Sequence, residues 1–236
     1  MTERYSLTRR NLRDTIIILS LGSALCFDAG SGTLFIAFCM LGLGCFIHCV
    51  SKGILIRNIV LCTEGIYRIV RHPYYLANFL IDWSFCLLSG SLLLLLLYPF
   101  LFFFAYGPTM RKEEQFLFAE HSDIFIESVL KTPQIFPDIN SIRNIRTLFN
   151  GFSAERITLK EYSRTMKFIA TGLLLGLIQR IKPDIIPRFQ YVSFPPIKDI
   201  DELLVVLLLI MLYVSSGVIL RLSNRDRYIR YESRSL

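Results

Sequence analysis

The sequence lacks the patterns that define several familiar classes of soluble protein. It has 236 residues and six cysteines, none of them in a C-x-x-C pair, so it indicates neither a zinc ribbon nor a disulfide framework. Its net charge of +7 does not form a basic stripe interleaved with aromatic residues, the arrangement that binds nucleic acid by base stacking. We therefore expect no metal and no nucleic acid among its ligands.

The sequence is instead rich in long apolar runs. Apolar residues make up 53% of the chain and the mean hydropathy is +0.49, above the usual range for a soluble domain. No small-residue cleavage site follows the first apolar run, so a cleaved signal peptide is not expected. These features predict an integral membrane protein.

Six apolar runs are candidates for membrane helices, and they cover residues 14–27, 33–50, 74–88, 92–107, 166–181 and 203–222. We predict an all-α, polytopic bundle of about six transmembrane helices. Lys and Arg concentrate at both termini and in the segments 51–73 and 108–165. Because basic residues favour the cytoplasmic side, we expect both termini and these two segments to be cytoplasmic.

A basic turn with the sequence RHPYY lies at the start of the third apolar run. Arg71 and His72 precede Pro73, and two tyrosines, Tyr74 and Tyr75, follow it. Proline is favoured in the first turn of a helix, and arginines at helix ends orient membrane proteins. The turn is therefore either a topology signal or a functional site at the edge of the membrane.

A pair of acidic residues follows the fourth apolar run. Glu113 and Glu114 stand next to Arg111 and Lys112, so they could simply form a solvated helix face. However, the expected topology puts them on the same side of the membrane as the RHPYY turn. Since the two segments flank one apolar hairpin, we expect them to lie close together.

These two segments together resemble the isoprenylcysteine carboxyl methyltransferases, whose core the phospholipid methyltransferases share. The resemblance covers about residues 59–137. It is carried by the pattern G-x-Y-x-x-x-R-H-P-x-Y, an apolar hairpin, then E-E-x-x-L and two spaced prolines, here Gly65, Tyr67, Arg71, His72, Pro73, Tyr75, Glu113, Glu114, Leu117, Pro133 and Pro137.

The resemblance implies a site for S-adenosylmethionine at the cytosolic edge of the membrane, with a lipid-like acceptor entering from the bilayer. The positions that it assigns to the cofactor are Tyr67, Arg71, His72, Pro73, Tyr74, Tyr75, Glu113 and Glu114. Backbone groups of residues 59–62 could add contacts. A carboxylate can accept from the cofactor's ammonium or ribose, a cation can meet its carboxylate, and tyrosine faces suit its adenine or sulfonium.

The acceptor side departs from the family pattern. An arginine usually precedes the glutamate pair by one turn, but Thr109 stands there, and Arg111 is among the nearest cations. Carboxyl methylation of a prenylated cysteine is the leading prediction, and N-methylation of a phospholipid headgroup is the alternative. A sterol-type reductase using NADPH and a membrane protein without enzymatic activity are more distant hypotheses.

Two further features within the apolar runs have both a structural and a functional interpretation. Asn78 and Asp82 would share one face of a helix and either contact the acceptor or form an interhelical hydrogen bond. Gly42 and Gly44 either approach the cofactor or allow close helix packing.

For domain organisation, we predict a methyltransferase core over residues 1–165, with its cytosolic cofactor-binding segments at 51–73 and 108–137. Residues 166–236 would add two transmembrane helices and a basic tail.

Overall fold

A computed structural model describes residues 9–55, 62–185 and 200–232, and every regular element within these ranges is helical. The elements, in chain order, are α1 (Arg9–Cys26), α2 (Ser31–Ile54), η1 (Gly65–Arg68), α3 (Pro73–Leu88), α4 (Leu92–Lys131), α5 (Ile139–Ile142), η2 (Arg143–Thr147), η3 (Ala154–Arg156), α6 (Leu159–Ile185) and α7 (Ile200–Glu232). The predicted all-α class is therefore confirmed.

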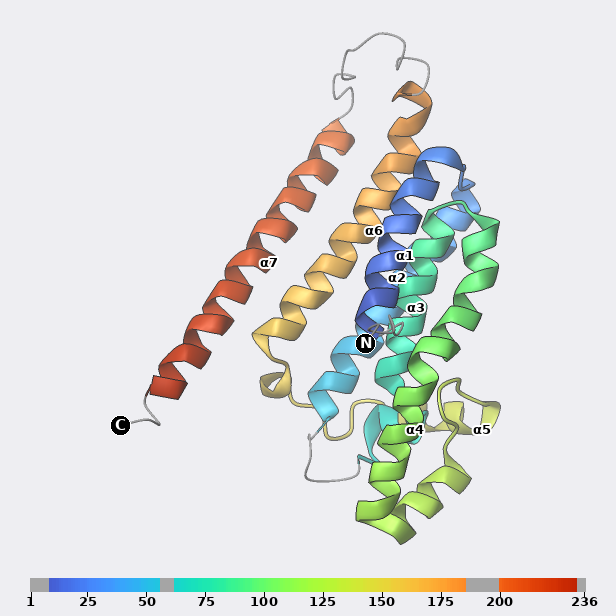
Figure 1. Cartoon of the computed structure of the whole chain (residues 1–236), viewed down its shortest axis with the longest axis vertical. Helices are drawn as coiled ribbons and strands as arrows, with labels where there is room; N and C mark the ends of the chain where they lie inside the picture. Colours follow the sequence, from blue (N-terminus) through green and yellow to red (C-terminus); the bar gives the residue numbers. More distant parts are fainter. Residues whose placement is uncertain (1–8, 56–61, 186–199, 233–236) are drawn as a thin grey trace, which may run out of the picture.

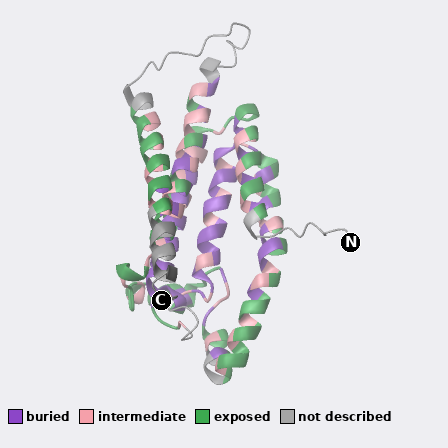
Figure 2. Cartoon of the chain, turned by 60° about the vertical axis from the view of Figure 1, so that its left-hand side comes forward, coloured by how far each residue is buried: buried purple, intermediate pink, exposed green. Residues whose placement is uncertain are grey.

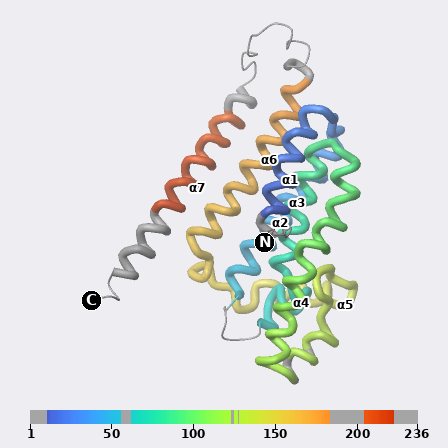
Figure 3. Tube along the Cα trace, viewed as in Figure 1, coloured from blue at the N-terminus to red at the C-terminus, as the bar shows by residue number. Residues whose placement is uncertain are grey.

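Helix α3 lies at the centre of the bundle and packs against α1, α2, α4 and α6. The short connections from α1 to α2 and from α3 to α4 lie at one end of the bundle, whereas η1 and α5 lie at the other end (Figures 1 and 3). The two segments expected to form a site thus share one end of the fold.

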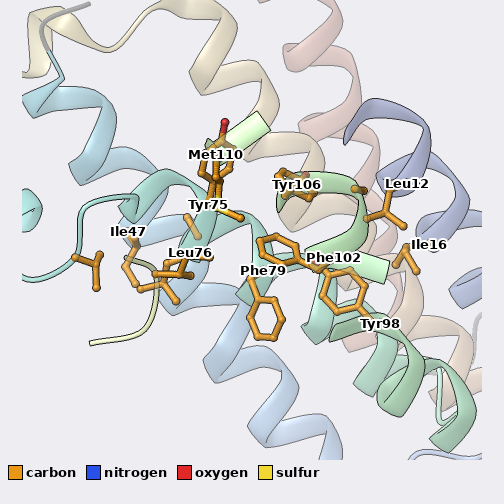
Figure 4. Packing of buried hydrophobic residues seen from close by; sticks show 14 of the residues in the cluster. Leu12, Ile16, Ile47, Tyr75, Leu76, Phe79, Tyr98, Phe102, Tyr106 and Met110 are labelled. Carbon is orange, nitrogen blue, oxygen red and sulfur yellow. The ribbon is translucent and has the colours of Figure 1, made fainter. Parts of the chain in front are cut away.

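The aromatic side of α3 forms the larger of two apolar clusters. Tyr75 and Phe79 of α3 pack with Tyr98, Phe102 and Tyr106 of α4 (Figure 4). The rings of Phe102 and Tyr106 are stacked with centroids 4.5 Å apart. This aromatic packing fixes α4 against the helix that begins with the RHPYY turn.

Close packing of α2 on α3 depends on a glycine. A Cβ atom added to Gly44 would stand 2.7 Å from Cγ1 of Ile81, whereas one added to Gly42 would have no atom within 4 Å. The structure therefore gives Gly44 a packing function, as small residues commonly have between membrane helices.

Three of the described helices are long and apolar enough to cross a membrane, over Ser31–Ile54, Leu92–Ser122 and Leu204–Arg221. This is fewer than the six predicted. Helix α3 has only 16 residues, and charged residues interrupt the apolar character of α1 and α6. The last span is only 6% buried, and Figure 2 shows exposed residues along α7. These helices support an integral membrane protein.

Helix α4 extends well beyond the fourth apolar run, which ends at residue 107. Helix α4 continues to Lys131, with Pro99 and Pro108 inside it and non-helical backbone angles at His121. The apolar run ends near residue 107, but the following residues are good helix formers such as Arg, Lys, Glu and Leu. Glu113 and Glu114 consequently lie within a continuous helix rather than beyond its end.

Helix α6 is integrated into the bundle rather than appended to it. Phe168 and Leu175 belong to the second apolar cluster. The Gln179 amide donates to the carbonyl oxygens of Phe27, at 3.0 Å, and Leu88, at 3.1 Å. These contacts satisfy backbone groups after α1 and at the end of α3. Helix α6 crosses residue 165 without a break. The domain boundary predicted at that residue stays a prediction.

Candidate active site at one end of the bundle

The turn before α3 requires a glycine. Gly65 has a φ of +58°, and a Cβ atom there would stand 2.6 Å from the carbonyl oxygen of Asn150. Only glycine adopts such a conformation without strain. From this turn, the buried side chain of Tyr67 donates to the carbonyl oxygen of Ser51 at 3.3 Å, so it anchors η1 to the end of α2.

Backbone hydrogen bonds hold the RHP residues in place. His72 is the N-cap of α3 and Pro73 occupies its first turn, as the sequence predicted. The amides of Arg71 and His72 donate, each at 2.9 Å, to the carbonyl oxygens of Pro133 and Gln134. The loop after α4 therefore fixes the backbone of the turn.

Helix α5 follows that loop and starts with a capping box. The backbone N–H of Ser141 donates to Asp138 at 2.6 Å, and the Ser141 hydroxyl accepts from the Asp138 amide at 3.0 Å. The Ser141 N–H lowers the pKa of the Asp138 carboxyl. This cap defines where the loop that supports the RHP turn ends.

The glutamate pair meets the turn directly. The Tyr75 hydroxyl donates to Oε1 of Glu113 at 2.7 Å. Nε2 of His72 lies 3.1 Å from Oε1 of Glu114, and Nη2 of Arg71 lies 3.2 Å from the same oxygen. The expected proximity of the two motifs is confirmed, and the two carboxylates bind different residues of the turn.

Arg71 has one donor that no residue in the described part of the chain satisfies. Its Nε atom is buried and has no hydrogen-bond partner among the described residues, and a buried donor without a partner is unfavourable. A carboxylate of a bound ligand would satisfy this donor. The carboxylates of Glu113 and Glu114 have lone pairs beyond those used by Tyr75 and His72, so they could accept from ligand amines or hydroxyls.

Tyr74 makes its contacts with other helices. Its hydroxyl accepts from Nη1 of Arg164 at 2.7 Å, and Nζ of Lys52 lies 3.9 Å from the centroid of its ring. The His48 ring lies 5.1 Å from the Tyr74 ring. Neighbouring tyrosines thus face two groups of polar residues, Tyr75 toward α4 and Tyr74 toward α2 and α6.

Sequence reasoning missed His48, Lys52, Glu161 and Arg164. No local motif marks these residues, because they come from segments more than 100 positions apart. Only the packing of α6 on α2 brings them together.

Asn78 and Asp82 both bind Arg13 of α1. Nε of Arg13 donates to Oδ1 of Asp82 at 2.8 Å, and Nη2 donates to Oδ1 of Asn78 at 2.9 Å. The Tyr98 hydroxyl adds a bond to Asp82 at 3.3 Å. These contacts correspond to the interhelical interpretation of the two residues. Arg13 was expected only as a topology signal, so its partners were not predicted.

The remaining predicted positions contribute less to this geometry. Arg111 is exposed on α4. Residues 59–61 lie outside the described residues, and Cys62 contacts the carbonyl oxygen of Ile54 with Sγ at 3.9 Å.

The fold and this site define the class: an all-helical integral membrane protein with a basic turn paired to two carboxylates at one end of the bundle. The sequence model of the isoprenylcysteine carboxyl methyltransferase (ICMT) family matches residues 25–119. The match contains α2, α3 and both motifs, which confirms the resemblance and indicates a membrane methyltransferase. It does not include α6 or α7. No curated protein and no solved structure matches the chain.

Proposed function

We propose that the chain is an integral membrane methyltransferase that uses S-adenosylmethionine to methylate a lipid-like acceptor. The leading acceptor is the carboxylate of a prenylated cysteine. The observation that carries the proposal is the joining of the RHPYY turn to the glutamate pair, with Tyr75 bound to Glu113 and His72 to Glu114.

The chemistry of this site suits the cofactor. The unsatisfied Nε of Arg71 would donate to the cofactor's carboxylate, and Glu113 would accept from its ammonium or ribose hydroxyls. The tyrosine faces would attract a sulfonium cation. When bound, S-adenosylmethionine supplies an electrophilic methyl group. The protein's contribution is to hold that group and the acceptor in line and to keep water away.

A carboxylate acceptor requires no general base near neutral pH. Its oxygen forms a bond to the methyl carbon as the carbon–sulfur bond breaks, and the electron pair of that bond neutralises the sulfonium. An amine acceptor would first have to lose a proton. N-methylation of a phospholipid headgroup remains the second candidate, because Thr109 stands where carboxyl-methylating enzymes usually place an arginine, and Arg111 is exposed on α4.

We also propose that the end of the bundle with η1 and α5 faces the cytoplasm, together with both termini. The basic residues of segments 51–73 and 108–165 support this orientation. Reporter fusions at the C-terminus test it: activity of a cytoplasmic reporter is expected, and activity of an exported reporter would contradict it.

Transfer of a tritiated methyl group tests the proposed reaction. The purified protein is incubated with labelled S-adenosylmethionine and either N-acetyl-S-farnesylcysteine or phosphatidylethanolamine. Base-labile label in the farnesylated product is expected, since a methyl ester hydrolyses in base. Base-stable label in the phospholipid would favour the second candidate, and no transfer to either acceptor would count against both.

A further inference from the structure

A second group of polar residues lies beside the proposed cofactor site, and the function proposed above uses none of them except Tyr74. We call it the Glu161 cluster, and it consists of His48 and Lys52 of α2, Tyr74 of α3, and Glu161 and Arg164 of α6. The family match ends before α6, so two members of the cluster lie outside the matched residues.

The cluster is deeply buried on the α2 side and more open at Arg164. The exposed fractions are 0% for His48, 8% for Lys52 and 6% for Glu161, whereas the Arg164 side chain is 33% exposed. Burial of ionic side chains in a membrane protein is costly and is often associated with function. A ligand could approach most easily from the side of Arg164.

The charges of the cluster do not balance. Lys52 and Arg164 each contribute one positive charge, and Glu161 contributes one negative charge. Nη1 of Arg164 donates to Oε2 of Glu161 at 2.9 Å and to the Tyr74 hydroxyl at 2.7 Å, and Nζ of Lys52 lies 3.6 Å from Oε1 of Glu161. Among the five residues of the cluster, two cations face one carboxylate, so the charge of a bound anion would complement them.

His48 provides an independent indication of a ligand. Its side chain is fully buried, and neither ring nitrogen has a hydrogen-bond partner among the described residues. Nε2 faces Glu161 at 3.6 Å, a distance beyond hydrogen-bond reach. A buried imidazole without a partner is unfavourable, and its ring N–H could donate to an anion held between Lys52 and Arg164.

The cluster is adjacent to the site where methyl transfer is proposed. The rings of Tyr74 and Tyr75 have centroids 6.2 Å apart, and Tyr75 binds Glu113. Tyr74 therefore connects the Glu161 cluster, through Arg164, to the proposed cofactor site. An acceptor bound at the cluster would lie next to the first turn of α3.

We propose that the Glu161 cluster binds the anionic group of the membrane-borne acceptor, with Lys52 and Arg164 as its charged ligands. Glu161 holds these cations when no acceptor is bound and competes with the incoming anion. The anion is either the carboxylate of a lipidated cysteine or the phosphate of a phospholipid. This inference rests on the proposed methyltransferase function.

Equilibrium binding to the full-length protein in detergent tests the inference without requiring turnover. The probes are N-acetyl-S-farnesylcysteine, its uncharged carboxamide, and short-chain phosphatidylethanolamine with the matching diacylglycerol as its uncharged counterpart. S-adenosylmethionine binding is measured separately on every variant. If the wild type does not bind S-adenosylmethionine, this counts against the proposed function. The comparison of charged with uncharged probes tests the Glu161 cluster separately.

We expect the affinity of the wild type for one anionic probe to be about tenfold or more higher than its affinity for the uncharged counterpart. This ratio corresponds to the usual contribution of a charge-assisted hydrogen bond. Lys52→Gln and Arg164→Gln should each remove most of that preference and leave S-adenosylmethionine affinity unchanged. Arg164→Lys should retain part of it. The control is Lys167→Gln, which changes an exposed lysine of α6 and should alter nothing.

Glu161→Gln distinguishes a binding site from a structural ion pair. Removing the competing carboxylate should strengthen binding of the anionic probe, whereas loss of a purely structural contact would weaken it or leave it unchanged. A farnesylcysteine preference identifies the carboxylate, and a phospholipid preference identifies the phosphate. The inference is overturned if the wild type shows neither preference, or if Lys52→Gln and Arg164→Gln both leave it intact.

Discussion

The Tyr75 hydroxyl donates a 2.7 Å hydrogen bond to Oε1 of Glu113, joining two residues 38 positions apart. Tyr75 lies in the first turn of α3 and Glu113 lies well inside α4. Because both helices also pack through the aromatic cluster around Phe79 and Phe102, the relative position of the two motifs is set by the core.

Tyr75→Phe tests whether this contact positions Glu113 for the cofactor. The change removes one hydroxyl and preserves the aromatic packing. A hydrogen bond to a charged group contributes about 1.5–3 kcal/mol, so we expect S-adenosylmethionine affinity to fall roughly tenfold. Calorimetric titration measures this, with Tyr162→Phe, an exposed tyrosine of α6, as the control. If Tyr75→Phe, Tyr162→Phe and the wild type bind S-adenosylmethionine with equal affinity, the contact does not position Glu113 for the cofactor.

Glu114→Gln should affect both the cofactor and the turn. The substitution removes the negative charge that faces Arg71 at 3.2 Å and His72 at 3.1 Å. We expect a lower melting temperature together with weaker S-adenosylmethionine binding, because the RHP turn loses its link to α4. Glu120→Gln, at an exposed position of the same helix, should change neither quantity. An unchanged melting temperature would mean that the loop at Pro133 suffices to hold the turn.

The Arg13–Asp82 pair should be required for stability rather than for acceptor binding. Asp82 is fully buried and lies 2.8 Å from Arg13, so Asp82→Ala leaves a charge without its partner and should cost about 3–5 kcal/mol. The double substitution Arg13→Met, Asp82→Leu should recover most of that loss. Thermal denaturation in detergent measures both variants.

The opposite pattern at this pair would favour the acceptor-contact interpretation. In that case Asp82→Ala would keep the melting temperature of the wild type and raise the KM for the acceptor.

The two glycines of α2 provide a matched comparison. Gly44→Ala places a Cβ atom 2.7 Å from Ile81 and 3.1 Å from its backbone nitrogen, so α2 and α3 must separate, at a cost of roughly 1–3 kcal/mol. Gly42→Ala meets no atom within 4 Å and should be neutral or slightly stabilising, since alanine favours helix. Melting temperatures test both variants. Weakened cofactor binding by Gly42→Ala would instead support a cofactor contact for these glycines.

Hydropathy predicted most of the fold because the apolar runs are long and clearly bounded. The starts and ends of α2 and α3 lie within about four residues of the expected limits. The end of α4 was not predicted, because apolar character stops near residue 107 while helix-forming residues continue. Three of the six predicted spans correspond to described helices that are long and apolar enough to cross a membrane. The other three runs, which lie in α1, α3 and α6, are short or flanked by charges.

The candidate site was predictable only where short motifs mark it. RHPYY and the glutamate pair are local patterns, and topology brought them to the same end. Arg13 and the Glu161 cluster had no such signal: an arginine near the N-terminus or a glutamate at a helix start is typical of a solvated position. Their partners are defined by packing between α1, α2, α3 and α6, which sequence periodicity does not specify.

The most direct test of the central claim is a calorimetric titration of the detergent-purified protein with S-adenosylmethionine and, separately, with NADPH. The same titrations are repeated on Glu113→Gln, with Glu120→Gln as the matched control. We predict saturable S-adenosylmethionine binding by the wild type and by Glu120→Gln, at least tenfold weaker binding by Glu113→Gln, and no binding of NADPH. A wild-type protein that binds NADPH and not S-adenosylmethionine would contradict the account.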